Sequence, residues 1–420
     1  MDKIWLNKQK QIMNNIVIIG GGTAGWLSAL YLNDKFKNSN ITLIESDEIG
    51  ILGAGEGSTA NLKTILNELG ITDNDLIENC DATFKVGIDF ENWTNENDSY
   101  FHPLQYNKLG KIPIHAFHFN ARLFAKYLKK VSLERGVIWV EGIVEKPITN
   151  DNDEIVGLKV GETIVPSDFV IDCTGFRRLL IGNHYKSKWK SYSEHLKVNA
   201  AIPFFIHENT NELYTKTRSI AMNHGWMWQI PLQTRKGCGY IFDMNEITEE
   251  EAKQEVIKFL GHNVEFNKLI KFEPGCYEKV WIKNCIAIGL SGGFLEPLEA
   301  TSIMTTVIQL IVFYNMTMKN KTPENYNDLV HEVNNQNMLF IYYHYFGNKN
   351  TTSFWKKVME SRKNKPKRLL DIIDNQDNIK SDIKINEVWK FLEIFPIDAW
   401  NIINNGIKNR KLITDGKNLL

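Results

Sequence analysis

The stretch Asn15-Ile16-Val17-Ile18-Ile19-Gly20-Gly21-Gly22-Thr23-Ala24-Gly25 decides the fold of this chain. It begins with a β-branched, apolar run of the kind that forms a buried parallel strand, and the glycines that follow end this strand. Apolar side chains then recur at helical spacing from Trp26 to about Phe36, and residues 41–44 have the composition of a second strand. This order predicts a β-α-β unit close to the start of the chain.

The glycines of this stretch fit the pattern G-x-G-x-x-G at positions 20, 22 and 25. Gly20 permits a tight turn after the strand, Gly22 lets the backbone approach a pyrophosphate, and Gly25 allows the helix to pack closely on the sheet. Thr23 and Ala24 lie at the start of that helix, where unpaired N–H groups and the helix dipole favour an anion. The spacing therefore predicts a dinucleotide site rather than a merely structural turn.

An acidic residue completes the pattern at the end of the second strand. Glu45 follows Gly25 by about twenty residues, which is the spacing of the carboxylate that binds a ribose hydroxyl in dinucleotide-binding folds. Two later segments, 172–175 and 288–293, resemble the second and third flavin-contact motifs of glutathione-reductase-like FAD enzymes. Because G-x-G-x-x-G occurs convincingly only once, we expect FAD without a second unit for NADPH, and flavin that is reduced elsewhere.

The composition points to a globular protein that acts on a small molecule. The chain has 420 residues, of which 43% are hydrophobic, and 49 Lys and Arg against 50 Asp and Glu leave a formal charge of −1. No global field recruits nucleic acid or an anionic membrane. The five cysteines are scattered and form no C-x-x-C pair, which argues against a disulfide framework and a zinc site. We expect a cytoplasmic protein, because residues 1–15 lack a secretory signal and the apolar run 303–314 is too short to cross a bilayer.

The distribution of elements predicts an α/β protein with a glutathione-reductase-like FAD-binding fold and a second, largely helical substrate lobe. The expected FAD-binding module is discontinuous and comprises residues 1–60, 110–200 and 270–318. The expected substrate-binding lobe comprises residues 61–109, 201–269 and 319–420. Within it we expect a helical stretch at about 62–79 and a helical C-terminal region from about residue 324.

An aromatic motif, Gly225-Trp226-Met227-Trp228-Gln229-Ile230-Pro231, gives the first specific sign of function. Trp226 and Trp228 are two residues apart, so in a strand both side chains lie on one face, and Pro231 ends the strand. By itself this pattern fits two core tryptophans as well as a rigid aromatic wall. Its form, G-W-x-W-x-I-P, resembles the signature of the flavin-dependent halogenases, best known from the tryptophan halogenases.

Further stretches resemble the same family in the same order, from about residue 15 to 356. Thr83-Phe84-Lys85 resembles the stretch with the family's active-site lysine, and 293–301, Gly-Phe-Leu-Glu-Pro-Leu-Glu-Ala-Thr, resembles the stretch with its active-site glutamate and halide site. The loop Gly53–Gly57 resembles a flavin-proximal loop of the family. Segments 340–345 and 353–355 resemble a further stretch of the tryptophan halogenases. The resemblance implies flavin contacts at Gly55, Leu290 and Ile303.

The resemblance implies a defined chemistry. Reduced flavin, O2 and a halide ion yield hypohalous acid, which travels through a tunnel to an electron-rich aromatic substrate. Lys85 would hydrogen-bond this acid or carry the halogen as a haloamine. Glu299 would orient the acid, or stabilise the cationic ring and take its proton. Backbone N–H groups near Thr301 and Ser302 would hold the halide, and Trp226, Trp228 and Pro231 would form the tunnel wall.

Two departures from the family affect specificity. Ala300-Thr301-Ser302 stands where the family usually has Ser-Thr-Gly, so the halide pocket differs in shape if the lost glycine occupied a position with φ > 0. Only about 65 residues follow Trp355, fewer than in tryptophan halogenases. We therefore expect a more open site for an indole, a phenol or a similar aromatic compound. We expect a separate flavin reductase and a small aromatic substrate as partners. A homodimer is compatible with the sequence.

Two other functional classes stay open at this point. A flavin-dependent aromatic hydroxylase shares the FAD fold, but it has no need for Lys85 or for the tryptophan wall. A non-catalytic flavin-binding protein has no need for Lys85 and Glu299. The histidines, including His102, His115, His118 and His195, show no metal-ligand spacing, so we predict no metal site.

Overall fold

The computed structural model describes residues 13–49, 56–104, 115–207, 215–347, 352–369 and 394–408. One half of the molecule is built on a six-stranded sheet of order β20-β21-β12-β1-β2-β8, in which all strands except β20 are parallel. Its strands are β1 (Asn15–Ile19), β2 (Asn40–Glu45), β8 (Ile138–Glu141), β12 (Phe169–Asp172), β20 (Trp281–Ile282) and β21 (Cys285–Ala287). The expected β-α-β unit is confirmed, with β1 at the centre of the sheet because both of its faces are buried.

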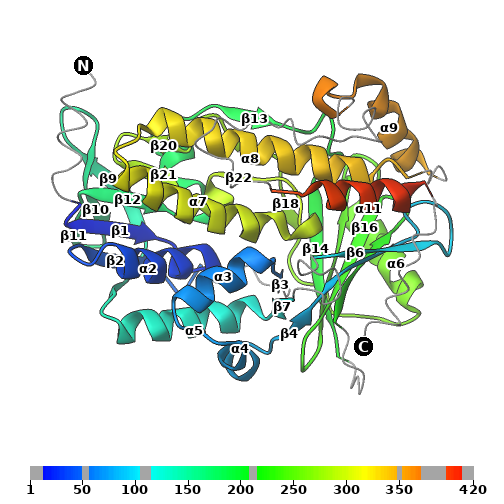
Figure 1. Ribbon diagram of the computed structural model, residues 1–420, viewed down its shortest axis with the longest axis horizontal. Coiled ribbons are helices and arrows are strands. Elements are labelled where there is room, and N and C mark those ends of the chain that lie inside the picture. The colour runs from blue at the N-terminus through cyan, green and yellow to red at the C-terminus, as the bar shows by residue number, and fades with distance from the viewer. Residues whose placement is uncertain are drawn as a thin grey trace.

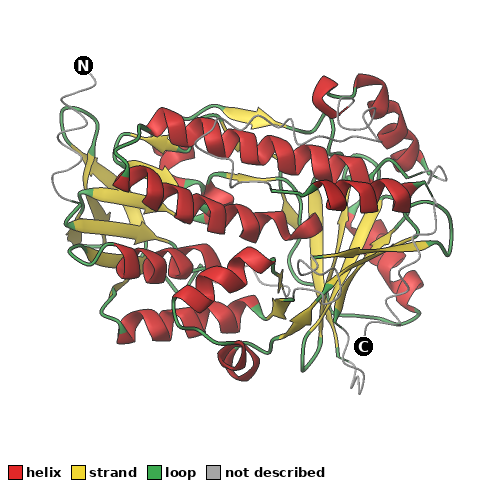
Figure 2. Ribbon diagram, viewed as in Figure 1, coloured by secondary structure: helices red, strands yellow, loops and turns green. Residues whose placement is uncertain are grey.

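Helices cover this sheet (Figures 1 and 2). They include α2 (Thr23–Lys35), α5 (Ala121–Glu134) and α7 (Thr301–Met318), and a three-stranded meander of β9 (Val144–Thr149), β10 (Ile155–Val160) and β11 (Thr163–Pro166) lies beside them. By length and composition, the helical segment Leu298–Met318 has the properties of a membrane span, but 56% of its most apolar window is buried in the protein. It contacts α2 and α3 (Ala60–Glu68), so its apolar side chains belong to the core.

The helical stretch expected at 62–79 is two helices rather than one. Helix α3 ends before Gly70, which has a φ of 71°, and α4 (Asp73–Asn79) begins after Thr72. The Thr72 side chain accepts a hydrogen bond from the backbone N–H of Asp75, and the Asp75 carboxylate accepts one from the backbone N–H of Thr72. This capping box starts a new helix, and the glycine provides the left-handed turn between the two.

The other half contains a seven-stranded sheet of order β18-β14-β17-β16-β15-β5-β6. Its strands are β5 (Gly87–Glu91), β6 (Ser99–Pro103), β14 (Ala200–Ile206), β15 (Lys216–Ala221), β16 (Gly225–Pro231), β17 (Lys236–Phe242) and β18 (Ile270–Lys271). The α/β class and the FAD-binding fold are confirmed. The second lobe, however, is not largely helical as we expected, since its helices pack around this sheet. The buried apolar runs of β14 and β16 form strands that both pair with β17.

The helices of this half are α6 (Glu249–Leu260), α8 (Pro323–His344), α9 (Ser353–Ser361) and α11 (Ile397–Ile407). Helix α8 runs along the molecule and reaches both halves (Figure 1). Its first part, with Tyr326 and Val330, belongs to the core around the six-stranded sheet, whereas its last part, with Phe340 and Tyr343, belongs to the core around β16. The division of the chain into the six segments given above stays a prediction.

Candidate active site

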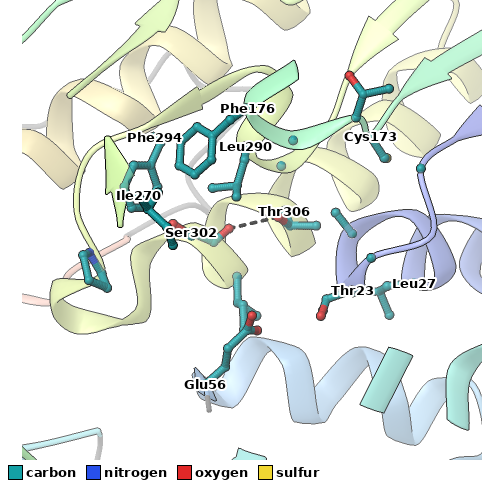
Figure 3. Close-up of a pocket in the computed structure, with 18 of the residues that line it drawn as sticks. Thr23, Leu27, Glu56, Cys173, Phe176, Ile270, Leu290, Phe294, Ser302 and Thr306 are labelled. Carbon is teal, nitrogen blue, oxygen red and sulfur yellow. Dashed lines mark hydrogen bonds between the residues drawn. The ribbon is translucent and has the colours of Figure 1, made fainter. Parts of the chain in front are cut away.

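A cavity of about 970 Å³ extends from the turn after β1 to the inner face of the seven-stranded sheet (Figure 3). Residues that we assigned to the cofactor line one end of it, namely Gly20, Gly22, Thr23, Ala24, Glu45, Leu290 and Ile303. Residues that we assigned to catalysis and to the tunnel wall line the other end, namely Lys85, Glu299, Trp226 and Trp228. One space therefore contains both groups, although they come from distant parts of the sequence. Gly55 lies outside the described residues.

The cofactor end has the shape and the polarity that a dinucleotide needs. A Cβ atom added to Gly22 would meet nothing within 4 Å, so the backbone of the turn is open to the cavity. A Cβ atom on Gly25 would lie 1.7 Å from the carbonyl oxygen of Gly20, so only glycine lets α2 approach the strand this closely. No side chain caps the N-terminus of α2, and its N–H groups are left for an anion. These features fit the pyrophosphate of FAD.

Glu45 is held at the end of β2 by two donors that the sequence did not reveal. Its carboxylate accepts hydrogen bonds from Nε1 of Trp26, at 3.1 Å, and from Nζ of Lys129, at 2.6 Å. Lys129 comes from α5, more than eighty positions away in the chain. The carboxylate is thus fixed at the cavity wall, where it can accept a further hydrogen bond from a ribose hydroxyl.

Lys85 lies at the end of β4 (Thr83–Lys85), which pairs with β7 (Ala116–Phe119). Its side chain is buried and only 1% exposed, and Nζ donates to the carbonyl oxygen of Ser58 at 3.1 Å. Burial lowers the pKa of Lys85 to about 8, although the nearby charge of Glu299 acts in the opposite direction. Near neutral pH the amine therefore exists in both its protonated and its neutral form.

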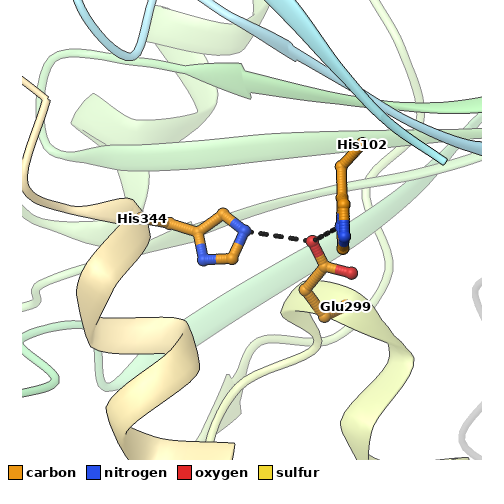
Figure 4. A group of neighbouring side chains, drawn as sticks. All are labelled: His102, Glu299 and His344. Carbon is orange, nitrogen blue, oxygen red and sulfur yellow. Dashed lines mark hydrogen bonds and ion pairs between the residues drawn. The ribbon is translucent and has the colours of Figure 1, made fainter. Parts of the chain in front are cut away.

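Glu299 lies in a strained turn directly before α7. Its φ is 61° and that of Ala300 is 55°, both in the left-handed region, which turns the carboxylate into the protein. Oε1 lies 2.7 Å from Nδ1 of His102 and 3.0 Å from Nε2 of His344 (Figure 4). Burial by itself would raise the pKa of Glu299, but the two histidines hold it well below the usual range of a glutamate. Glu299 is therefore a carboxylate.

The two histidines were missed by the sequence analysis, because His102 on β6 and His344 at the end of α8 are far apart in the chain and only the fold brings them together. The ligand atoms of His102, Glu299 and His344 lie within 4.8 Å of one another, which is within reach of a metal ion. Hydrogen bonds to one carboxylate oxygen already account for this arrangement, and we assign no metal to it.

The aromatic wall is formed as expected by alternate residues of β16. The rings of Trp226 and Trp228 line the cavity with their centroids 6.1 Å apart. Nε1 of Trp226 donates to Glu296, a buried carboxyl group that also accepts from the hydroxyl of Tyr345. Pro231 ends the strand and does not line the cavity, unlike the tunnel-wall position that we expected for it. Its carbonyl oxygen accepts from the hydroxyl of Thr83.

The expected halide residues lie in the first turn of α7. Ser302 lines the cavity, and its carbonyl oxygen accepts from the hydroxyl of Thr306 (Figure 3). Thr301 is buried with its hydroxyl toward the carbonyl oxygen of Leu298. Ser302 has no positive φ, so the position that is usually glycine in the family makes no left-handed turn here. The absence of that glycine therefore does not distort this turn.

A further carboxyl group in the cavity was not predicted. Glu56 begins β3 (Glu56–Gly57), and burial raises its pKa to about 7. Within the described part of the chain no group hydrogen-bonds its Oε2 atom, and the residue lines the cavity near α2 (Figure 3). The glutamate in the quoted loop 53–57 was the only signal for it in the sequence.

Comparison with known proteins agrees with this geometry. The family model described as tryptophan halogenase matches residues 15–115 and 105–410. The chain belongs to the tryptophan halogenase family. It is therefore a flavin-dependent halogenase by descent, as the motifs around Lys85, Trp226 and Glu299 predicted.

Relatives and solved structures of the family cover most of the chain. Tryptophan 7-halogenase RebH of Lentzea aerocolonigenes is 29% identical over 83% of this chain and 79% of its own length. The 7-chloro-L-tryptophan 6-halogenase KtzR of Kutzneria sp. (strain 744) is 28% identical over 79% of each chain. The structure of Xcc4156, a flavin-dependent halogenase from Xanthomonas campestris, matches with a TM-score of 0.85 and 28% identity over 94% of this chain and 89% of that one.

Proposed function

We propose that this halogenase forms hypohalous acid at the flavin end of the cavity and passes it to an electron-rich aromatic substrate through Lys85. The proposal rests on the buried Lys85 amine, which shares one cavity with Glu299 and with the cofactor end. Reduced FAD, when bound, would supply two electrons to O2, and the halide would supply the other two as it is oxidised to hypohalous acid. The fit of Gly22, Gly25 and Glu45 to a dinucleotide supports FAD as the resident cofactor.

Each residue near the substrate has a distinct role in this proposal. In its neutral form Lys85 takes the halogen from hypohalous acid and releases water, and in its protonated form it donates a hydrogen bond to the acid. The N–X bond of the haloamine, or the O–X bond of hypohalous acid, breaks as the ring gains the halogen. The ring proton passes to Glu299 and then restores the Lys85 amine or completes a water molecule. Trp226 and Trp228 keep the substrate away from the cofactor, and the N–H groups near Thr301 and Ser302 hold the halide.

The substrate class is an indole, a tryptophan-like compound or a phenol. RebH and KtzR act on tryptophan or a chlorinated tryptophan, as their names state. The aromatic wall and the apolar lining of the cavity suit a flat aromatic ring. A separate flavin reductase supplies reduced FAD. The five cysteines are free and buried, which fits a cytoplasmic setting.

The proposal is tested by mass spectrometry of reactions that contain FAD, a flavin reductase, NADH, O2 and chloride, bromide or iodide with a panel of indoles and phenols. We expect a halogenated product that decreases by at least about a hundredfold in Lys85→Ala. The control is Lys188→Ala, since the Lys188 side chain is 78% exposed. Oxygenated product without halogen would overturn the proposal in favour of a hydroxylase.

A further inference from the structure

His344 faces a hydrogen-bond acceptor on each of its ring nitrogens. Nδ1 lies 2.8 Å from the carbonyl oxygen of Phe340, and Nε2 lies 3.0 Å from Oε1 of Glu299. A carbonyl oxygen only accepts hydrogen bonds, so Nδ1 carries a proton. A neutral imidazole has one N–H group, and in this ring Nδ1 uses it. The contact between Nε2 and Glu299 therefore needs a second proton.

That second proton belongs to the imidazole rather than to the carboxyl group. Oε1 of Glu299 also faces Nδ1 of His102 at 2.7 Å, so two ring nitrogens converge on one oxygen (Figure 4). A carboxylate oxygen accepts strongly from both rings, whereas a protonated Oε1 would donate to one ring and accept from the other only as a neutral hydroxyl oxygen. The 2.7 Å contact with Nδ1 of His102 is short, as is typical of a bond to a charged acceptor. His344 is fully buried, and a buried cation without a paired anion would be costly. Glu299 supplies that anion.

The arrangement leaves the other carboxylate oxygen available. Among the described residues none hydrogen-bonds Oε2 of Glu299, and Glu299 lines the cavity. In Figure 4 both dashed lines meet at one carboxylate oxygen of Glu299, and the other oxygen has none. One oxygen is thus fixed in the protein, while the other has no hydrogen bond to a described residue and belongs to a side chain that lines the same cavity as Lys85.

We propose that His344 is held as a doubly protonated imidazolium ion that fixes Glu299 as a carboxylate with Oε2 directed at the substrate. His344 is then a positioning residue, since it acts through Glu299 and does not line the cavity. Its role in turnover rests on the proposed function, whereas its protonation state does not. The titratable groups that face this pair are His102 and Tyr100 on β6 and Lys85 on β4.

The protonation state is measured by ¹⁵N NMR of the holoenzyme with labelled histidine. We expect both ring nitrogens of His344 to carry protons at pH 8, where an ordinary histidine, with a pKa of about 6.5, is neutral. His344→Gln assigns the signal. Glu299→Gln provides a second assignment, because removal of the anion should make His344 neutral at the same pH. A neutral His344 in the unsubstituted enzyme would overturn the proposal.

The role in turnover is measured by the pH dependence of product formation in His344→Gln. The Gln amide can still donate to Oε1 but carries no charge, so burial should raise the pKa of Glu299 above its usual value. The ratio of turnover in the variant to turnover in the unsubstituted enzyme should fall from pH 8 to pH 6, because the ionised fraction of Glu299 decreases as the pH approaches the raised pKa of this group. Titration of Lys85 lowers turnover in both proteins over this range and therefore cancels in the ratio. An equal loss at every pH would mean a merely structural role and would refute the positioning function.

The matched comparison is His102→Gln. The geometry requires only one proton on His102, because Glu299 is its only described hydrogen-bond partner, and Gln can replace that donor. We therefore expect no new acid limb in this variant. If no substrate is halogenated while His344 shows two protons, the proposed function fails and the protonation assignment stands.

Discussion

The role that we propose for Lys85 in the reaction comes at a cost to the stability of the fold. Its ordinary pKa of 10.5 falls to about 8 because the charged form is buried, so below pH 8 the folded protein contains a charge that water would stabilise better. The shift corresponds to about 3 kcal/mol of stability. The unfolded chain binds this proton more tightly than the folded one, and this contribution to stability therefore increases as the pH rises from 8 to 10.5.

Lys85→Met should accordingly make the enzyme more stable and inactive. At pH 7 we expect an increase of about 1–3 kcal/mol in the free energy of unfolding, after the loss of the hydrogen bond to Ser58 is taken into account. The gain should disappear as the pH approaches 10.5. Urea unfolding at pH 7 and pH 10 measures both values.

Lys188→Met serves as the control for this experiment. The Lys188 side chain is 78% exposed, and an exposed ion pair contributes little to stability. We expect its unfolding free energy to stay within about 0.5 kcal/mol of the unsubstituted protein. A destabilised Lys85→Met protein at pH 7 would contradict the assignment of Lys85 as a strained buried base.

At the scale of the element, two glycines in the turn from β1 into α2 have different tasks. We expect Gly22 to make room for FAD, whereas Gly25 makes room for the packing of α2 on the strand. A side chain at Gly22 has free space in the protein, and its φ of −78° is open to any residue. A side chain at Gly25 collides with Gly20. The same substitution therefore has different effects at the two positions.

Gly22→Ala should fold normally and bind FAD at least about tenfold more weakly, because its methyl group occupies the space of the pyrophosphate. Gly25→Ala should lose several degrees of thermal stability as well, since α2 must move away from the sheet. Flavin fluorescence titration and thermal unfolding of the apoprotein distinguish the two effects. Equal FAD affinity in Gly22→Ala would contradict the assigned cofactor end.

The same elements show how far the sequence could predict the structure. The turn, Glu45 and the pair Trp226 and Trp228 follow from local spacing, because a strand or a helix alone determines which side chains share a face. The hydrogen bonds of His102 and His344 to Glu299 depend on β6, α8 and the turn before α7 meeting in space. No local pattern encodes such a meeting, so these histidines appeared as ordinary ones.

At the scale of the whole molecule, the cavity described above extends from one half to the other, and the proposed role of its tryptophan wall is to limit what passes along it. Trp228→Ala should widen the passage. We expect flavin oxidation to continue at an unchanged rate while the yield of halogenated product per flavin oxidised falls at least about threefold, because more hypohalous acid escapes.

The measurement is the ratio of product, determined by mass spectrometry, to NADH consumed, together with a small diffusible scavenger that reports escaped oxidant. Phe259→Ala is the control, since this aromatic side chain is 45% exposed on α6 and does not line the cavity. If product and flavin oxidation fall together in Trp228→Ala, the wall serves binding of the cofactor rather than retention of the oxidant.

Helix α8 places an angular constraint on the chain. It has 22 residues. Its first part packs in the core around the six-stranded sheet, its second part packs in the core around β16, and His344 is its last residue. Each residue of an α-helix advances the phase by about 100°, so one residue inserted after Val333 would turn His344 well away from Glu299 while the first part of the helix stayed in place. About seven added residues would restore the phase but shift His344 by about 10 Å along the axis. Between Val333 and His344 the number of residues is thus set by the need to aim one imidazole at one carboxylate.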